Sequence, residues 1–146
     1  MIEFSTVTPF RLARSIAAAG LRNPAIYLLI CDAEAAAAVQ ADLVAEIDVQ
    51  LGAVVHSETA SDMRANDLNV WRDGSIRIVL VDRWIPELVD SLDRHSAVLV
   101  QDGGKLVLLA KKEWAERMLR RAPNLRNRLT DIVQIKPEDF PRGEGV

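Results

Sequence analysis

Short apolar runs alternate with stretches of helical periodicity along this chain. The runs that have the length of buried strands span residues 25–31, 53–56, 76–81, 105–110 and 131–135. Helical segments are expected at 9–19, from 32 to about 51, at 63–71, 86–96 and 113–121, and once more after residue 123. Apolar strands that alternate with helices are typical of a parallel sheet covered on both faces. We therefore predict an α/β fold: a three-layer α/β/α sandwich with a five-stranded parallel sheet and an extra N-terminal helix over 9–19.

Polar and glycine residues mark where these elements stop. Gly20 and Gly52 follow the first two helical segments, as expected at helix ends. Asp32 directly follows the first strand, and its carboxylate is expected to cap the next helix by accepting free backbone N–H groups. The run at 53–56 is short, which suits a strand at the edge of the sheet.

The chain reads as one unit. Nearly half of its residues are apolar, which is enough for a sizeable core, and we find no internal repeat or dividing linker. We expect a single domain over 1–140 and a flexible tail over 141–146. A single cysteine excludes an intrachain disulfide framework, and the N-terminus lacks the pattern of a secretory leader, so we expect a cytoplasmic protein.

The overall charge gives little reason to expect an anionic partner. The formal net charge is −3, and no apolar run is long enough to cross a membrane. Nucleic acids and acidic membrane surfaces attract a clustered basic face. We therefore expect neither as a partner.

Ligands of open parallel sheets bind beyond the carboxyl ends of the strands, so the residue types found there indicate the chemistry. A phosphate-binding loop would need glycines, a lysine and a Ser/Thr after the first strand. This chain has Cys31-Asp32-Ala33-Glu34 there, and the two carboxylates would repel phosphate. No nucleotide cofactor is expected.

Other catalytic patterns are equally missing from the sequence. His56 and His95 fall on different elements, with no third metal ligand at a recognisable spacing, and there is no G-x-S-x-G motif. Cys31 is interpreted as an inert buried thiol, because the adjacent acids oppose activation. We predict no enzymatic activity and no metal or other cofactor.

The most specific stretch is the last third of the chain. Trp114-Ala115-Glu116-Arg117 follows the strand at 105–110, and Arg121-Ala122-Pro123-Asn124-Leu125-Arg126-Asn127-Arg128-Leu129 leads into the strand at 131–135. This arrangement resembles the second half of the core domain in AAA+ ATPases and their STAND relatives, the signal-transduction ATPases with numerous domains. The extra N-terminal helix also suits that family. For the five predicted strands, numbered in chain order, the resemblance implies the sheet order 5-1-4-3-2.

The resemblance has different implications for individual residues. Asp82 matches the Walker B aspartate, but Arg83 and Trp84 stand where the family would have its catalytic acid. Arg128, and less closely Arg126, falls in the region from which AAA+ subunits project an arginine finger into a neighbouring site.

Those two arginines also have a plainer interpretation, in which they are solvated or pair with Asp131 and Glu138. Trp84 and Trp114 are similarly open to two interpretations. They either anchor an interface, where tryptophan is favoured, or pack helix against sheet.

Taken with the missing phosphate loop, the resemblance implies an inactive STAND-like domain. Such domains are associated with bacterial conflict and signalling systems, in which they act as adaptors or scaffolds. The implied partner is a protein, such as an active ATPase, a protease or another effector, and self-association is left open.

A divergent receiver domain is the alternative. Asp32, Asp82 and Lys136 fall at the ends of the first, third and fifth predicted strands, where a receiver holds its metal-binding acid, phosphoacceptor and lysine. Against this, Ala110 replaces the expected hydroxyl residue, and the N-terminal helix is surplus.

Overall fold

The computed structural model describes residues 5–6, 9–19, 25–52, 55–63, 76–96 and 104–135. They contain a six-stranded sheet in the order β1-β6-β2-β5-β4-β3, in which every pairing is parallel. The strands are β1 (Ser5–Thr6), β2 (Ala25–Ile30), β3 (Val55–Thr59), β4 (Ile76–Leu80), β5 (Lys105–Ala110) and β6 (Asp131–Gln134).

The predicted fold class and strand order are confirmed. The five predicted strands correspond to β2, β3, β4, β5 and β6, and their order in the sheet is the 5-1-4-3-2 order that was expected. The sequence analysis missed β1, which pairs with the outer side of β6 through Ser5 opposite Val133. Two polar residues carry no hydrophobic signal, so this strand is defined by its pairing alone.

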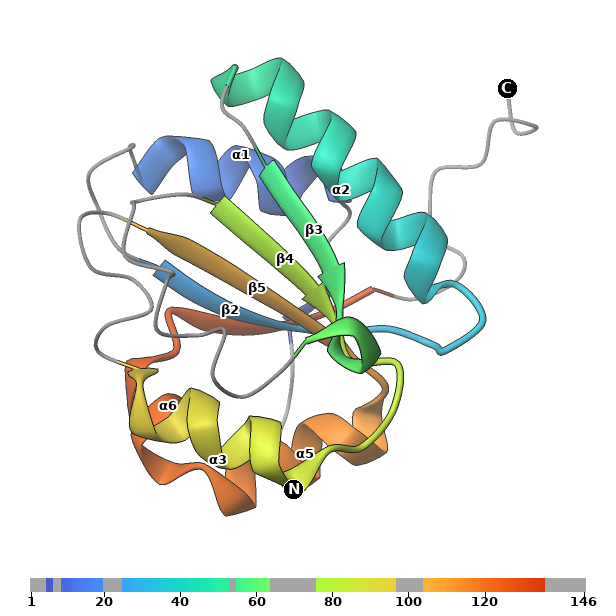
Figure 1. Cartoon of the computed structure of the whole chain (residues 1–146). Helices are drawn as coiled ribbons and strands as arrows, with labels where there is room; N and C mark the ends of the chain where they lie inside the picture. The colour runs from blue at the N-terminus through green and yellow to red at the C-terminus, as the bar shows by residue number, and fades with distance from the viewer. Residues whose placement is uncertain are drawn as a thin grey trace.

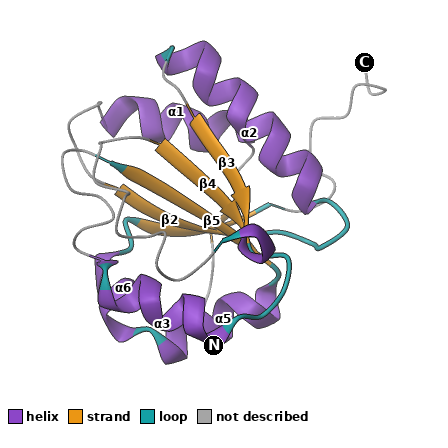
Figure 2. Cartoon of the chain, viewed as in Figure 1, coloured by secondary structure: helices purple, strands orange, loops and turns teal. Residues whose placement is uncertain are grey.

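Helices cover both faces of the sheet (Figures 1 and 2). On one face lie α1 (Pro9–Ala19) and α2 (Ala36–Leu51), and on the other lie α3 (Pro86–Arg94), α5 (Lys112–Arg121) and α6 (Pro123–Arg128). The expected N-terminal helix is confirmed. None of the helices in the described ranges combines the length and apolar character needed to span a bilayer.

The core has two halves, one on each side of the sheet. Successive side chains of a strand point to opposite faces, so each buried strand serves both halves. In β2, Leu28 packs toward α3, α5 and α6, whereas Leu29 packs toward α1 and α2. Both β2 and β5 are buried along their whole length, as expected of central strands.

Some predicted boundaries were wrong. The second strand, expected at 53–56, is β3 at Val55–Thr59, and it does occupy the sheet edge. A short 3-10 helix, η1 (Ala60–Asp62), follows it. The helix expected at 63–71 falls almost entirely outside the described residues, and Met63 itself is extended.

The predicted cap of α2 was also wrong. The helix begins at Ala36, with Ala35 in the cap position and no side-chain cap bond. Residues 33–35 form a turn in which the backbone carbonyl of Asp32 accepts from the Ala35 N–H at 3.0 Å. The turn moves the helix start away from the Asp32 carboxylate, which therefore remains exposed.

Candidate functional site

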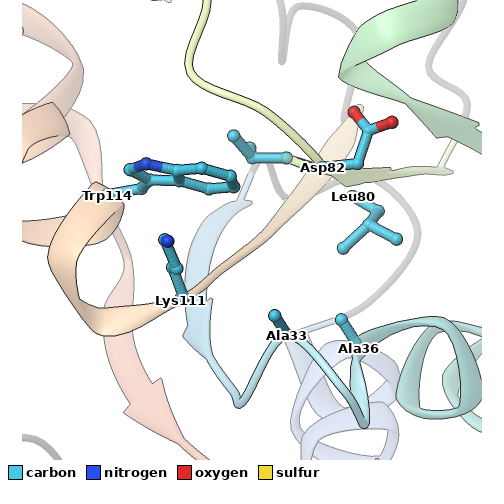
Figure 3. A pocket seen from close by; sticks show the side chains of 7 residues that line it. Ala33, Ala36, Leu80, Asp82, Lys111 and Trp114 are labelled. Carbon is cyan, nitrogen blue, oxygen red and sulfur yellow. The ribbon is translucent and has the colours of Figure 1, made fainter.

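The carboxyl ends of β2, β4 and β5 meet at one edge of the sheet, where they position the candidate side chains. Asp32 follows β2, Asp82 follows β4 and Lys111 follows β5. Between these strand ends lies a partly open pocket of about 140 Å³ (Figure 3), which we call the strand-end pocket. It is lined by Ala33, Ala36, Leu80, Val81, Asp82, Lys111 and Trp114.

Asp82 is held by a structural contact. Its Oδ1 accepts the backbone N–H of Ser61 at 3.0 Å, and its Oδ2 accepts the Ser61 hydroxyl at 2.6 Å. Figure 3 shows the carboxylate at the rim, pointing away from the other lining side chains. Asp82 therefore ties the end of β4 to η1 at the edge of the sheet.

The two candidate tryptophans are half-buried and each lies beneath a cation. The Lys111 ammonium is 4.3 Å from the centre of the Trp114 ring and 3.7 Å from Oε2 of Glu113. The Arg117 guanidinium is 5.1 Å from the centre of the Trp84 ring. Both rings pack against the core between the sheet and α3, α5 and α6, so they support the helix layer and still reach the surface.

Arg126 and Arg128 lie at the opposite ends of the strands, on the amino side of the sheet. Both are exposed on α6, which leads into the amino end of β6, and neither forms an ion pair within the described ranges. The Asp131 carboxylate accepts from the Ile132 N–H at 2.8 Å, while Glu138 lies outside the described residues. The structure therefore separates Trp84 and Trp114 from Arg126 and Arg128, because α5 carries Trp114 in its first turn and α6 follows its other end.

The receiver-type residues are only partly described. Asp32 and Asp82 are both exposed at the carboxyl edge, but Lys136 lies outside the described ranges. Within those ranges, no three His, Cys, Asp or Glu side chains come together as a metal site. Cys31 is buried, and this burial, together with the Asp32 charge, raises its thiol pKa to about 11.

A basic stretch was missed by the sequence analysis. Residues 111–128 carry seven of the chain's 18 Lys and Arg but only two of its 21 Asp and Glu. The exposed or half-exposed cations, which we call the α5–α6 basic face, are Lys111, Lys112, Arg117, Arg120, Arg121, Arg126 and Arg128. The signal was present in the sequence, but the net charge of the whole chain concealed it.

Comparisons with known proteins bear on the fold. No family model and no curated protein matches this chain. Among solved structures, it is similar to a DNA polymerase III gamma subunit-related protein from Thermotoga maritima, with a TM-score of 0.59 and 14% identity. The fold is AAA+-like. The match covers 89% of this chain but 47% of the Thermotoga chain, so this chain spans about half the length of that structure.

Proposed function

We propose that this chain is a non-catalytic AAA+-like interaction module, a degenerate NTPase domain that acts as a scaffold or regulator in a bacterial multi-component defence or signalling system. The carboxyl edge of the sheet is the observation that carries the proposal. Two carboxylates, Asp32 and Glu34, are exposed where phosphates would lie, and the carboxylate of Asp82 is bound to Ser61. The negative charge of these carboxylates would repel the phosphates of a nucleoside triphosphate.

The α5–α6 basic face is the surface that we assign to the protein partner. Arg120, Arg126 and Arg128 are exposed and make no ion pair within the described residues, so a partner carboxylate would meet them without displacing an existing one. Arginine is also favoured at protein interfaces. The complementary partner has an acidic surface.

A protein fits this face better than a nucleic acid does. Glu113 and Glu116 interrupt the cations of α5, and Glu87, Asp90 and Asp93 lie on neighbouring α3. These carboxylates are spread over two helices, where a wide duplex would bring its phosphates close to all of them, whereas a single acidic segment of a protein can lie along the cations of α5 alone. Duplex DNA is therefore the alternative ligand in the binding experiment described below.

The first experiment measures binding of ATP and ADP with Mg²⁺ by calorimetry. We expect no binding to the isolated chain, and micromolar affinity would overturn the proposal. The same titration with Mg²⁺ and beryllofluoride tests the receiver-like alternative, which predicts saturable binding that Asp82→Asn abolishes.

The second experiment tests the interface. A stoichiometric partner is purified with the wild-type chain, and its affinity is measured for Arg126→Ala, Arg128→Ala and the control Arg14→Ala on the opposite helix layer. We expect about a tenfold loss for the α6 variants, typical of one lost charged interface contact, and none for the control. Equal affinity for all variants, or tighter binding of duplex DNA than of the protein, would remove α6 from the proposed interface.

A further inference from the structure

The strand-end pocket offers a binding site that the basic face alone does not explain. Its walls are mainly apolar, formed by the Trp114 ring, two aliphatic side chains and two alanines. A cavity of about 150 Å³ with apolar walls holds one benzene molecule. The volume of about 140 Å³ therefore fits a single leucine- or phenylalanine-sized group.

The charged groups of the pocket are turned to other partners. The Asp82 carboxylate accepts both of its hydrogen bonds from Ser61 at the rim. The Lys111 ammonium lies over the face of Trp114 and close to Glu113. Because one charge of each sign borders the cavity and both are engaged, the group that enters it is uncharged and apolar.

The charges around the pocket indicate which charge the partner's residues on either side of the apolar group should carry. Lys111 lies at the mouth, Lys112 is exposed beside it, and α5 continues from there to Arg117 and Arg120. A ten-residue helix is about 15 Å long, which five residues of an extended peptide would span. An acidic segment running along α5 would meet cations at both ends of the helix.

We propose that the strand-end pocket receives one apolar side chain from an acidic segment of the protein partner, and that the segment then follows α5 toward Arg120. This inference rests on the adaptor function proposed above. It assigns the anchor of the complex to the pocket and its charge recognition to α5. An approach along the α2 side is disfavoured, because Asp32 and Glu34 would repel the same carboxylates.

The test uses a blocked undecapeptide with leucine at the centre and glutamate at the other ten positions, so that five residues on either side of the anchor can follow α5. Its affinity is compared by calorimetry with that of the same peptide carrying serine at the centre, and with a leucine peptide flanked by lysines. Burial of one leucine predicts about tenfold weaker binding of the serine peptide. The lysine-flanked peptide is expected not to bind.

Two matched variants assign the effect to the pocket. Ala33 and Ala38 are both exposed, but only Ala33 lines the cavity. Ala33→Phe fills the pocket and is expected to remove the difference between the leucine and serine peptides, whereas Ala38→Phe retains it. Circular dichroism verifies that both variants are folded.

The outcomes separate this inference from the adaptor proposal. If the leucine and serine peptides bind equally, or if Ala33→Phe keeps the tenfold difference, the pocket is not the anchor, while binding through the arginines still stands. If lysine-flanked leucine binds as well as the acidic peptide, the assigned charge is wrong. If no peptide binds at millimolar concentration, the inference is overturned, and the affinities of the α6 variants for the purified partner decide the adaptor function separately.

Discussion

Cys31 shows how strongly one side chain depends on its place in the fold. The thiol is buried at the end of a central strand, and burial followed by the charge of Asp32 raises its pKa to about 11 from an ordinary value of 9.0. At pH 8, two units of pKa lower the thiolate fraction about a hundredfold. We expect modification by a thiol-specific disulfide reagent to be at least that much slower in the folded chain than in urea. Similar rates in both states would contradict the buried placement.

The same shift has a consequence for stability. The folded chain holds the Cys31 proton more tightly than the unfolded chain does, so its contribution is fully present below pH 9 and is lost as pH rises toward 11. In Cys31→Ala this contribution is missing at every pH. The difference in unfolding free energy between the two proteins should therefore shrink over that interval, and a constant difference would show that the thiol does not titrate as inferred.

Asp82 is a second single residue that contributes to stability, in this case through hydrogen bonds. Asp82→Ala removes the acceptors of the Ser61 N–H and hydroxyl, both at an exposed site. We expect a loss of about 1 kcal/mol in urea unfolding, the usual size for such bonds. Asp82→Asn keeps acceptor capacity and should lose less. Ser61→Ala in the Asp82→Ala background should add little, and full additivity would argue against the contact.

At the scale of single elements, the end of α2 depends on Gly52. This residue adopts φ of 61°, and its N–H donates to the Asp48 carbonyl at 2.8 Å. A Cβ there would meet no heavy atom within 4 Å, so Gly52→Ala causes no clash. We expect it to lower the free energy of unfolding by about 1 kcal/mol, because alanine is strained at this positive φ. Gly52→Asn should be milder, because asparagine tolerates this conformation. Equal stability of all three proteins in urea would contradict the left-handed cap.

Two helices of one layer are joined by an ion pair. Arg121 Nε donates to Asp90 Oδ1 at 2.8 Å, and its Nη2 donates to Oδ2 at 3.0 Å. This hydrogen bonding holds the pKa of Asp90 below its ordinary range. The stabilisation is therefore present above the ordinary pKa of about 4 and is lost as pH falls through the lowered value. Asp90→Asn should lower Tm at pH 7, and the difference in Tm between the two proteins should shrink as the pH falls below 4; a difference that stays constant down to the lowest pH at which both proteins fold would point to another cause.

Individual strands show which parts of the fold could be predicted from the sequence. The strand β5 was predicted residue for residue, because its five apolar residues, 106–110, lie between Lys105, which is also buried, and Lys111. The edge strand β3 was displaced, since its residues after Val55 are polar and only half-buried or exposed. The contact between Ser61 and Asp82 joins residues 21 positions apart, and no local pattern records it. No local pattern records the strand-end pocket either, because residues at three separate strand ends line it.

At the scale of the whole molecule, charge is unevenly distributed. The chain has a net charge of −3 and a pI near 5.4, yet residues 111–128 are strongly basic. At low ionic strength a local field of this kind acts over tens of ångströms, since the Debye length is about 30 Å at 0.01 M. An acidic protein of even charge would pass through a sulfonate column at pH 7.5, but we expect this chain to be retained through its α5–α6 basic face.

A pair of charge-matched variants tests this prediction. Arg126→Glu with Arg128→Glu alters the basic face, whereas Arg14→Glu with Arg83→Glu makes the same change in net charge at exposed sites outside it. If orientation toward the column depends on the basic face, only the first double variant should elute at clearly lower salt. If both elute together, retention follows total charge, and α5–α6 has no directional field with which to orient an acidic partner.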